Sequence, residues 1–376
     1  MIFADWFWPG YKAGGPITSL VNLVNALTDI DFLVVTTDRD LHSEQPYEGI
    51  TANTWVQYRE HVRVIYLSPD KLNKAGITDV VREVSADIYY LNSMFSYHFT
   101  LVPMMVLRRM SLHGKIILAP RGMLKSGALS VKPWKKKAFL TMARWMGLYK
   151  GIEWHATSPE EVNEIRAFAG NGSVIHLAAN ISLQGAASAP LAKVKGELSV
   201  LTVSRVSPEK GIAEAIAAMT HPDLGPLKLR WTIVGAIPDS EYARSCAAST
   251  NLSDNQEIIW LGEVPPNEIS ALMASHHILL SATLGENFGH AIIEALSSGR
   301  PAVITDRTPW RGLAASNAGF DLPVGETDKF LEAIKFFGFM DQANYDKWSQ
   351  GAAKYAADRL GEQDSMAATR RLFGLA

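Results

Sequence analysis

Short apolar runs alternate with segments of helical periodicity along nearly the whole chain, and no other feature limits the fold as strongly. Such alternation is typical of parallel sheets that carry helices on both faces. In the first half, the apolar runs predict strands over residues 1–5, 32–37, 62–67, 88–91, 115–119, 153–157 and 174–178. In the second half, they predict strands over residues 199–204, 230–235, 258–262, 278–282, 302–305 and 319–323. The sequence therefore predicts an α/β protein with two doubly wound parallel sheets.

The composition between the two halves indicates where one domain ends. Residues 183–196 are rich in Gly, Ala and Ser and cannot supply a hydrophobic core, so we expect a linker there. A length of 376 residues is typical of two or three domains, and a hydrophobic content of 47% suffices for a core in each. We expect Rossmann-like domains over residues 1–182 and 197–357, then a final helical segment over residues 358–376. Residues 41–60 lack clear periodicity and predict a long loop.

Charge and cysteine content exclude several classes of protein. The formal net charge of −2 argues against a protein that binds nucleic acid through its overall charge. The single cysteine, Cys246, excludes an intrachain disulfide and a metal site built from cysteines. The first residues include no basic region, and Asp5 interrupts their apolar run, so we expect no signal peptide. No uncharged apolar stretch reaches the roughly 18 residues of a spanning helix, and we expect a cytoplasmic protein.

The stretch from Leu284 to Ile304 predicts a turn and a helix between two strands. Small residues at 285–289 form the turn, and residues 290–298 form a helix that Gly299 ends. The N–H groups of such a turn and the positive end of the helix dipole suit an anionic or polyhydroxylated ligand. Glu294 falls among apolar residues of this helix, so its carboxylate needs a hydrogen-bond donor. An alternative to a ligand is a nearby arginine such as Arg300, with the glycines serving the turn alone.

Arg205 and Lys210 follow the predicted strand of residues 199–204. Ligands of open α/β sheets bind outside the carboxyl ends of the strands, so both cations project where a diphosphate would lie. Arginine can fork onto two phosphate oxygens, and lysine supplies a compact charge. Together they would stabilise the charge that develops on a departing diphosphate. The alternative is a solvated loop, which is common in a chain with 20% charged residues.

These two stretches resemble retaining glycosyltransferases of family 4. Glu286 and Glu294 reproduce a Glu-x7-Glu signature, and Arg205 and Lys210 fall in an Arg-x4-Lys-Gly arrangement similar to the diphosphate site of that family. The resemblance implies the GT-B fold, in which two doubly wound domains face each other across a cleft and the final helix crosses back to the first domain. It implies that the donor sugar and phosphate contact Glu286 and the backbone of Asn287, Phe288 and Gly289. It also implies that Glu294 binds the ribose hydroxyls and that Arg205 and Lys210 bind the diphosphate.

The same resemblance adds four residues of the first domain to the expected site. Gly14 and Gly15 lie between the first strand and an amphipathic helix, and the resemblance implies that their loop reaches the donor diphosphate. His98 follows a strand and is similar to a histidine that contacts the donor sugar or the reacting centre in the family. The alternatives are an ordinary turn for the glycines and a helix-start histidine satisfied by the backbone. Arg121 also follows a strand end and resembles a family loop on the cleft.

Residues 121–150 are strongly basic and contain no Asp or Glu. Trp134, Phe139, Met142, Trp145 and Met146 are interleaved with the charges. A basic amphipathic helix with aromatic residues can lie on an anionic membrane, here the inner face of the cell membrane. The alternative is a solvated helix whose Met and Trp side chains pack inward. The basic residues are Arg121, Lys125, Lys132, Lys135, Lys136, Lys137, Arg144 and Lys150.

Two Asp-x-Asp triplets flank one predicted strand, at Asp29 and Asp31 and at Asp38 and Asp40. In the other large glycosyltransferase fold, such a pair holds a divalent metal on the diphosphate. No other feature of that fold surrounds these residues, so we interpret the triplets as chance occurrences. We expect no metal and no cofactor, because Arg205 and Lys210 would take the metal's role.

The sequence thus predicts a metal-independent, retaining glycosyltransferase that uses a UDP- or GDP-linked sugar as donor. Residues 304–313 resemble members found in bacterial surface-polysaccharide assembly, which suggests a glycan or lipid-linked acceptor. One alternative of the same fold is a sugar-nucleotide 2-epimerase, and another is a non-enzymatic nucleotide-binding protein. A dinucleotide-dependent oxidoreductase requires a Gly-x-Gly-x-x-Gly string after a strand, which this sequence lacks.

Overall fold

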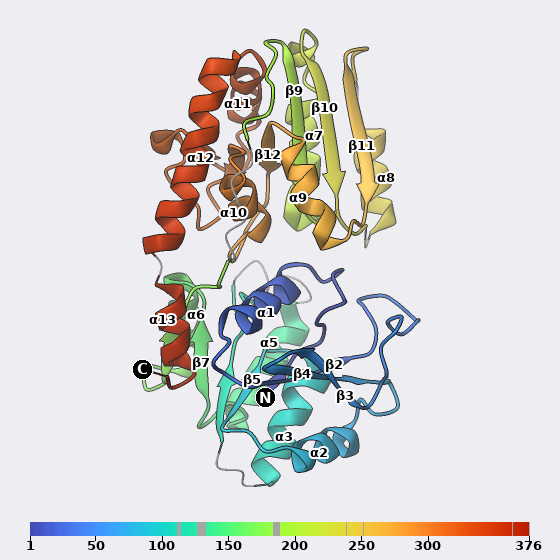
Figure 1. The fold of residues 1–376 in the computed structure, drawn as a ribbon, viewed down its shortest axis with the longest axis vertical. Coiled ribbons are helices and arrows are strands. Elements are labelled where there is room, and N and C mark those ends of the chain that lie inside the picture. The colour runs from blue at the N-terminus through green and yellow to red at the C-terminus, as the bar shows by residue number, and fades with distance from the viewer. Residues whose placement is uncertain are drawn as a thin grey trace. The chain divides into compact units, whose positions relative to one another are not determined.

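The computed structural model describes residues 1–110, 114–125, 133–182, 189–237, 239–250, 252–362 and 364–375. The chain divides into two compact units, one formed by Met1–Ile181 with Asp364–Ala376 and the other by Ser182–Gln363. Each unit is a sheet with helices packed on it (Figure 1). Among the described helices, none combines the length and the apolar character needed to cross a bilayer.

The first unit is built on one sheet, which in the described residues has eight strands in the order β3-β4-β2-β1-β5-β6-β7-β8. Every neighbouring pair is parallel except β3 and β4. The strand order grows in opposite directions from β1, so β1 and β5 flank a topological switch point. The strands are β1 (Ile2–Phe3), β2 (Phe32–Thr37), β3 (Trp55–Arg59), β4 (Val62–Leu67), β5 (Ile88–Leu91), β6 (Lys115–Leu118), β7 (Glu153–Ala156) and β8 (Ile175–Leu177).

Strand β3 shows that the prediction of a loop over residues 41–60 was wrong at its end. Trp55 pairs antiparallel with Ile65, and the register shifts between Gln57 and Arg59. Because β3 is an edge strand, none of its residues is fully buried, and the irregularity breaks the alternation of period two that identifies a strand. This edge is also the exception to the predicted all-parallel sheet.

Side chains of the first sheet alternate between two hydrophobic cores. Phe3, Val35 and Ile65 join the core that includes residues of α2, α3, α5 and α6, whereas Ile2 and Val34 join the core of α1 and α13. Helices therefore cover both faces, as a doubly wound sheet requires. The helices are α1 (Gly15–Ala26), α2 (Lys74–Glu83), α3 (Val102–Arg109), α5 (Pro133–Trp145), α6 (Pro159–Ala169) and α13 (Ser365–Leu372), and a π-helical turn (Tyr97–Leu101) precedes α3.

The second unit has a fully parallel sheet, with the order β11-β10-β9-β12-β13-β14 among the described strands. In chain order this is 3-2-1-4-5-6, which places the switch point between β9 and β12. The strands are β9 (Glu197–Val203), β10 (Lys228–Val234), β11 (Gln256–Gly262), β12 (Ile278–Ser281), β13 (Ala302–Thr305) and β14 (Gly319–Leu322).

Both faces of the second sheet are also covered. Leu198 and Val200 of β9 pack with α7 and α11, whereas Leu201 packs with α10 and α12 on the opposite face. The sequence prediction of two α/β halves is therefore confirmed for this unit. The helices are α7 (Ile212–Met219), α8 (Ser240–Ala248), α9 (Pro266–Ala274), α10 (His290–Ser297), α11 (Thr327–Gly338) and α12 (Gln342–Glu362), with 3-10 turns at Pro208–Lys210, Pro222–Leu224 and Ala314–Ser316.

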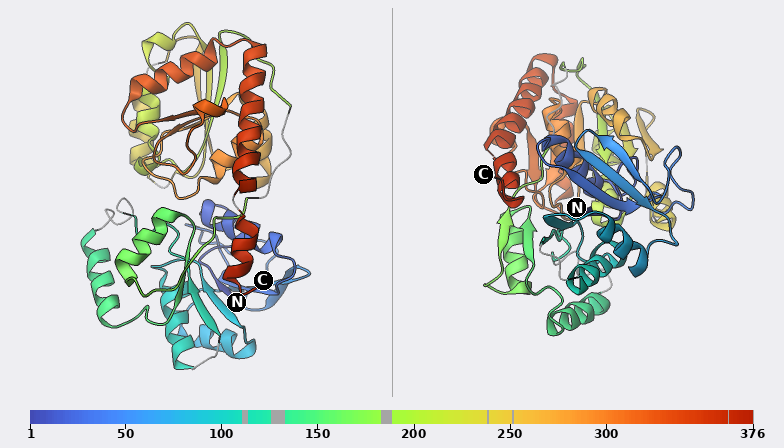
Figure 2. Two further views of the ribbon diagram at one scale, coloured as in Figure 1. Left: turned by 90° about the vertical axis from the view of Figure 1, so that its left-hand side faces the viewer. Right: turned by 60° about the horizontal axis from the view of Figure 1, so that its bottom comes forward.

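The segments that join the units differ from the expected boundaries. Residues 183–188 of the expected linker lie outside the described residues, and residues 189–196 belong to the second unit. There the buried Lys193 ammonium donates to the carbonyls of Glu197 at 2.6 Å and Gly338 at 3.0 Å. Helix α12 continues to residue 362, so the units part after that helix instead of at residue 357. Helix α13 then lies on the first unit, where Leu372 is buried (Figure 2).

Candidate functional site at the switch point of the second sheet

The loops that follow β9 and β12 are joined by close backbone contacts. Leu284 N–H donates to the carbonyl of Glu209 at 3.0 Å. Gly211 has a positive φ of 65°, and a Cβ at this position would lie 1.9 Å from the carbonyl oxygen of Ala282. Only glycine fits such a backbone and such a contact. The two loops therefore form one surface at the carboxyl ends of the central strands, where doubly wound sheets bind ligands.

Lys210 and Glu286 meet on this surface, one from each loop. The lysine Nζ lies 2.6 Å from Glu286 Oε2, with side chains 18% and 23% exposed. Arg205 lies at the start of the first loop and pairs with Glu209 at 3.1 Å, but both of these side chains are exposed. An exposed pair of this kind contributes little to stability, so Arg205 can leave Glu209 for an anion at low cost.

The turn that carries Glu286 is fixed by residues that the sequence interpretation did not assign to the site. The N–H of Glu286 donates to the carbonyl of Arg307 at 2.9 Å. Trp310, which is buried, donates from Nε1 to the carbonyl of Phe288 at 2.6 Å. The Phe288 ring is itself buried against Trp310, with ring centroids 5.3 Å apart, so only its backbone is available to a ligand. Gly289 has φ of 77°, and a Cβ there would lie 3.0 Å from Glu286 and from Ile292.

Two helices start at this surface without a side-chain cap. Helix α7 begins after Gly211 and helix α10 after Gly289, and neither glycine can offer a capping oxygen. By contrast, Asn73, Ser158 and Asp239 cap α2, α6 and α8 with their side chains. In α7 the N–H of Ala213 already donates to the hydroxyl of Tyr242 at 3.2 Å. The other first N–H groups of an uncapped helix need an acceptor, and an anion supplies one. The two N-termini and Lys210 thus form a basic surface suited to phosphate.

Glu294 lies in the middle of α10 and is partly buried. Burial raises the pKa of its carboxyl group to about 7. Among the described residues, no hydrogen bond reaches this carboxylate. Arg300 is not its partner, because that guanidinium donates to the carbonyls of Met273 at 3.1 Å and Ala274 and Ala189 at 3.0 Å. The alternative of a Glu294–Arg300 pair is therefore wrong.

Gly14 and Gly15 lie at the start of α1 in the first unit, after β1. Gly14 has φ of 67° and ψ of −125°, and no side chain caps this helix either. The loop before them is held by Asp40, whose Oδ2 accepts from the N–H groups of Tyr11 at 2.8 Å and Lys12 at 3.2 Å. Asp38 pairs with Arg39 at 2.8 Å. These carboxylates therefore have structural partners, although they form an Asp-x-Asp triplet.

His98 lies on the β5 side of the switch point between β1 and β5, in the π-helical turn that follows β5. Its Nδ1 is buried and has no hydrogen-bond partner among the described residues. Ser96 caps the same turn and donates to Asp5 Oδ1 at 2.6 Å, which links the ends of β1 and β5. Burial raises the pKa of Asp5, against the hydrogen bond from Ser96 and the charge of His98. The sequence interpretation assigned no site role to Asp5; its place at the carboxyl end of the first predicted strand was the missed signal.

Arg121 is held by hydrogen bonds to polar side chains of its own unit. Its guanidinium donates to Asn92 Oδ1 at 2.7 Å, to the hydroxyl of Tyr90 at 2.9 Å and to Asn180 Oδ1. The Tyr90 hydroxyl in turn lies 2.6 Å from Nδ1 of His155, whose pKa burial lowers to about 3. Arg121 also has φ of 56°, a strained conformation that these bonds maintain. This arginine therefore holds the strand ends of the first sheet together.

A family model agrees with this geometry. Residues 185–355, which include both loops of the switch point, match the model described as glycosyl transferases group 1. The alpha-monoglucosyldiacylglycerol synthase of Streptococcus pneumoniae is 28% identical over 143 residues. That match covers 37% of this chain and 32% of the relative, so the chain spans about a third of the length of this curated relative.

Solved structures of low sequence identity share the fold along nearly the whole chain. Sucrose-phosphate synthase from Thermosynechococcus elongatus superposes with a TM-score of 0.70 at 16% identity, over 94% of this chain and 92% of that one. Anabaena HepE, solved with UDP and glucose, has a TM-score of 0.68 at 16% identity, over 99% and 97% of the two chains. At these identities the likeness shows the fold alone, which is the GT-B fold predicted from the sequence.

Proposed function

Because residues 185–355 match the model of group 1 glycosyl transferases and the chain has the GT-B fold, we propose that this protein transfers a sugar from a nucleoside diphosphate sugar to a hydroxyl group with retained anomeric configuration. The observation that carries the proposal is the meeting of Lys210, Glu286 and two glycine-capped helix N-termini at one switch point. The donor diphosphate binds there, held by Arg205, Lys210 and the N–H groups of the helix starts.

Glu294 takes the ribose of the donor in this proposal. A partly buried carboxylate with a pKa of about 7 lacks donors, and the two ribose hydroxyls would provide them. Ligand binding would then lower the pKa of Glu294 again, because hydrogen bonds to the charged form favour it. Glu286, with the backbone of Asn287, Phe288 and Gly289, orients the sugar. The donor contacts that the resemblance implies for Gly14, Gly15 and His98 remain predictions.

In this proposal Lys210 exchanges its ion pair with Glu286 for one with the leaving phosphate during the reaction. The bond between the anomeric carbon and the diphosphate oxygen breaks, a bond from the acceptor oxygen to the same carbon forms, and the acceptor proton passes to the departing phosphate. Negative charge grows on that phosphate as its bond breaks. Lys210 shares its charge with Glu286 beforehand and with the leaving phosphate afterwards, so its contribution is larger in the transition state. We propose that the reaction needs no metal, because these cations fulfil that role.

The acceptor in this proposal is a glycan or a lipid-linked hydroxyl, in bacterial surface-polysaccharide synthesis. The name of the Streptococcus pneumoniae relative, a glycolipid synthase, supports an acceptor with a lipid portion. The Anabaena HepE structures contain UDP with glucose and UDP-glucose, which supports a UDP-linked donor ahead of a GDP-linked one.

A donor screen followed by product analysis tests the proposal. A UDP- or GDP-linked sugar at about 100 times its dissociation constant would stabilise the fold by roughly 2.7 kcal/mol, which a thermal-shift assay detects. Candidate acceptors are then added in excess chelator, and nucleotide release and the anomeric configuration of the product are followed by proton NMR. We expect acceptor-dependent release of the nucleoside diphosphate and retention. Conversion of the donor sugar to its 2-epimer without an acceptor product would establish the epimerase instead.

A further inference from the structure

Helix α5 of the first unit has two apolar faces, and only one of them belongs to the core. On the inner face, Ala143 is 1% exposed, and Phe139 and Leu140 pack against the buried cluster. The Phe139 ring lies 5.8 Å from that of Phe95 in an edge-to-face contact. The core contacts of this helix therefore involve residues other than its tryptophans.

The outer face carries large apolar side chains that remain in solvent. Trp134 is 70% exposed, Met142 is 52% exposed and Trp145 is 88% exposed. Trp134, Ala138, Met142 and Trp145 follow one another at intervals of four, four and three residues, and Thr141 lies three residues after Ala138. This is the spacing of one helical stripe, about 16 Å long from Trp134 to Trp145. The alternative that these Trp and Met side chains pack inward is wrong, because another set of residues fills the core.

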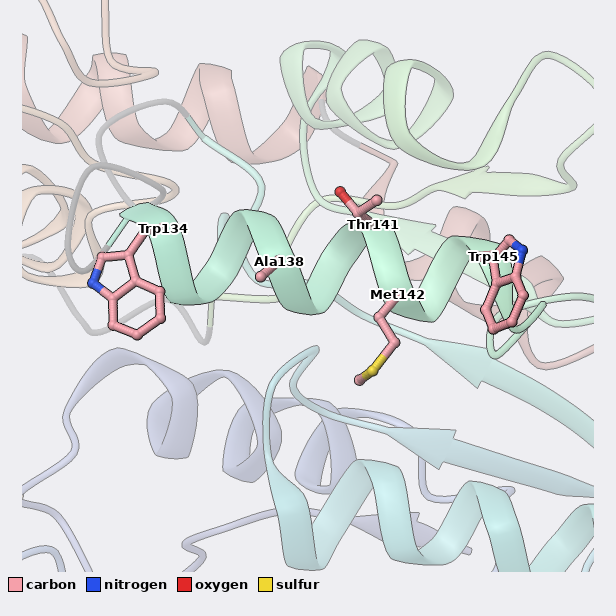
Figure 3. A pocket seen from close by; sticks show the side chains of 5 residues that line it. All are labelled: Trp134, Ala138, Thr141, Met142 and Trp145. Atoms are coloured by element: carbon pink, nitrogen blue, oxygen red, sulfur yellow. The ribbon is translucent and has the colours of Figure 1, made fainter.

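This stripe borders a hollow of about 560 Å³, whose lining residues all come from α5 (Figure 3). Sites for small molecules enclose most of the ligand surface, and one helix cannot do that. The stripe is thus a one-sided apolar surface that fits a broad, flat partner. Exposed apolar patches of this type mark contacts with proteins or membranes.

The charge around the stripe distinguishes these two partners. Residues 122–151 contain seven Lys and Arg and no Asp or Glu, and Arg144 lies exposed in the last turn of α5. An anionic bilayer combines negative headgroups with an apolar interior, and tryptophan favours the boundary between them. We propose that the outer face of α5 binds the surface of an anionic membrane, with Trp134 and Trp145 inserted at the headgroup level.

Binding to vesicles tests this inference separately from the proposed function. The full chain is sedimented with vesicles of phosphatidylglycerol and phosphatidylcholine in equal parts, and with vesicles of phosphatidylcholine alone. We expect binding to the anionic vesicles, weakened by salt because the charges are screened. The double substitution Trp134→Ala and Trp145→Ala should lower the partition coefficient by about tenfold or more, because apolar insertion contributes part of the affinity.

Matched variants separate insertion from loss of folding or of charge. The pair Leu252→Ala and Phe339→Ala removes two exposed apolar side chains of the second unit and should leave vesicle binding unchanged. The pair Arg144→Gln and Lys150→Gln should weaken binding to anionic vesicles by a few-fold, with a smaller salt dependence. Brominated lipids should quench tryptophan fluorescence in the unmodified protein and lose this extra quenching in the Trp134 and Trp145 variant.

Three results would overturn the inference. The first is a lack of binding to anionic vesicles at low salt. The second is equal binding by the tryptophan variant, with unchanged circular dichroism. The third is self-association that the tryptophan substitutions abolish while vesicles are ignored, because the face would then contact a second copy of this chain.

Discussion

The carboxyl ends of strands in the two sheets carry similar residues that serve different purposes. In the second unit, Arg205 follows β9 and is paired with the exposed Glu209. In the first unit, Arg121 follows β6 and donates to three acceptors that join strand ends. An arginine after a strand is therefore not by itself a ligand-binding residue. The number and burial of its own partners decide whether it remains available for a ligand.

The largest expected effect is on the free energy of unfolding, when one glycine of each unit is replaced by alanine. Gly211→Ala should destabilise the second unit by more than about 3 kcal/mol, since its Cβ would overlap the Ala282 carbonyl and its φ is positive. Gly14→Ala should cost only about 1–3 kcal/mol, because no atom lies within 4 Å of its Cβ and backbone strain is the main term. Denaturant unfolding measures both. Equal losses would show that the contact between the β9 and β12 loops is not close.

Lys210 gives the largest expected effect on the reaction. Lys210→Ala should lower turnover by on the order of 10²-fold or more, because it removes a charge that stabilises the departing phosphate. Arg205→Ala should act in the same direction. The matched control is Lys329→Ala, which removes an exposed lysine of α11 that pairs with Glu326. Steady-state kinetics with the donor found in the screen compare the three. Near-normal turnover in both site variants would contradict the diphosphate assignment.

Glu294 predicts a smaller effect, on stability as a function of pH. Its folded pKa of about 7 lies above the ordinary glutamate pKa of 4.5, so the folded state holds the proton more tightly than the unfolded chain. The stability of the ligand-free protein should therefore fall as pH rises from 4.5 to 7, by about 1–2 kcal/mol after allowance for partial exposure. Glu294→Gln should remove this part of the pH dependence. Parallel pH profiles of unfolding for the two proteins would show that Glu294 is not the titrating group.

The sequence predicted the regular parts of this fold because they obey simple periodicities. Largely buried strands such as β2 and β4 are mostly apolar runs, and their predicted bounds match the structure. The edge strand β3 was missed because it is irregular and half-exposed. The end of the second unit was misplaced because α12 continues through a polar stretch that resembles a boundary.

The local geometry of the candidate site was predictable where its residues are adjacent in sequence. Glu286, Gly289 and Glu294 belong to one strand-turn-helix unit, and the structure places Glu286 against Lys210 of the neighbouring loop. Contacts that depend on tertiary packing could not be predicted from the sequence. Examples are the hydrogen bonds from Trp310 to Phe288 and from Ser96 to Asp5. The two faces of α5 were undecided for the same reason, since the pattern alone does not say which apolar residues reach the core.

The central claim is that a nucleoside diphosphate binds between Lys210 and Glu294 at the β9/β12 switch point. Calorimetry with the free nucleoside diphosphate tests it most directly, on the unmodified protein, Glu294→Gln and Glu286→Gln. The account predicts an affinity loss of about tenfold in Glu294→Gln, through the ribose hydroxyls. It predicts equal or tighter binding in Glu286→Gln, because Lys210 then no longer shares its charge with Glu286. Loss of affinity in Glu286→Gln with none in Glu294→Gln would contradict the account.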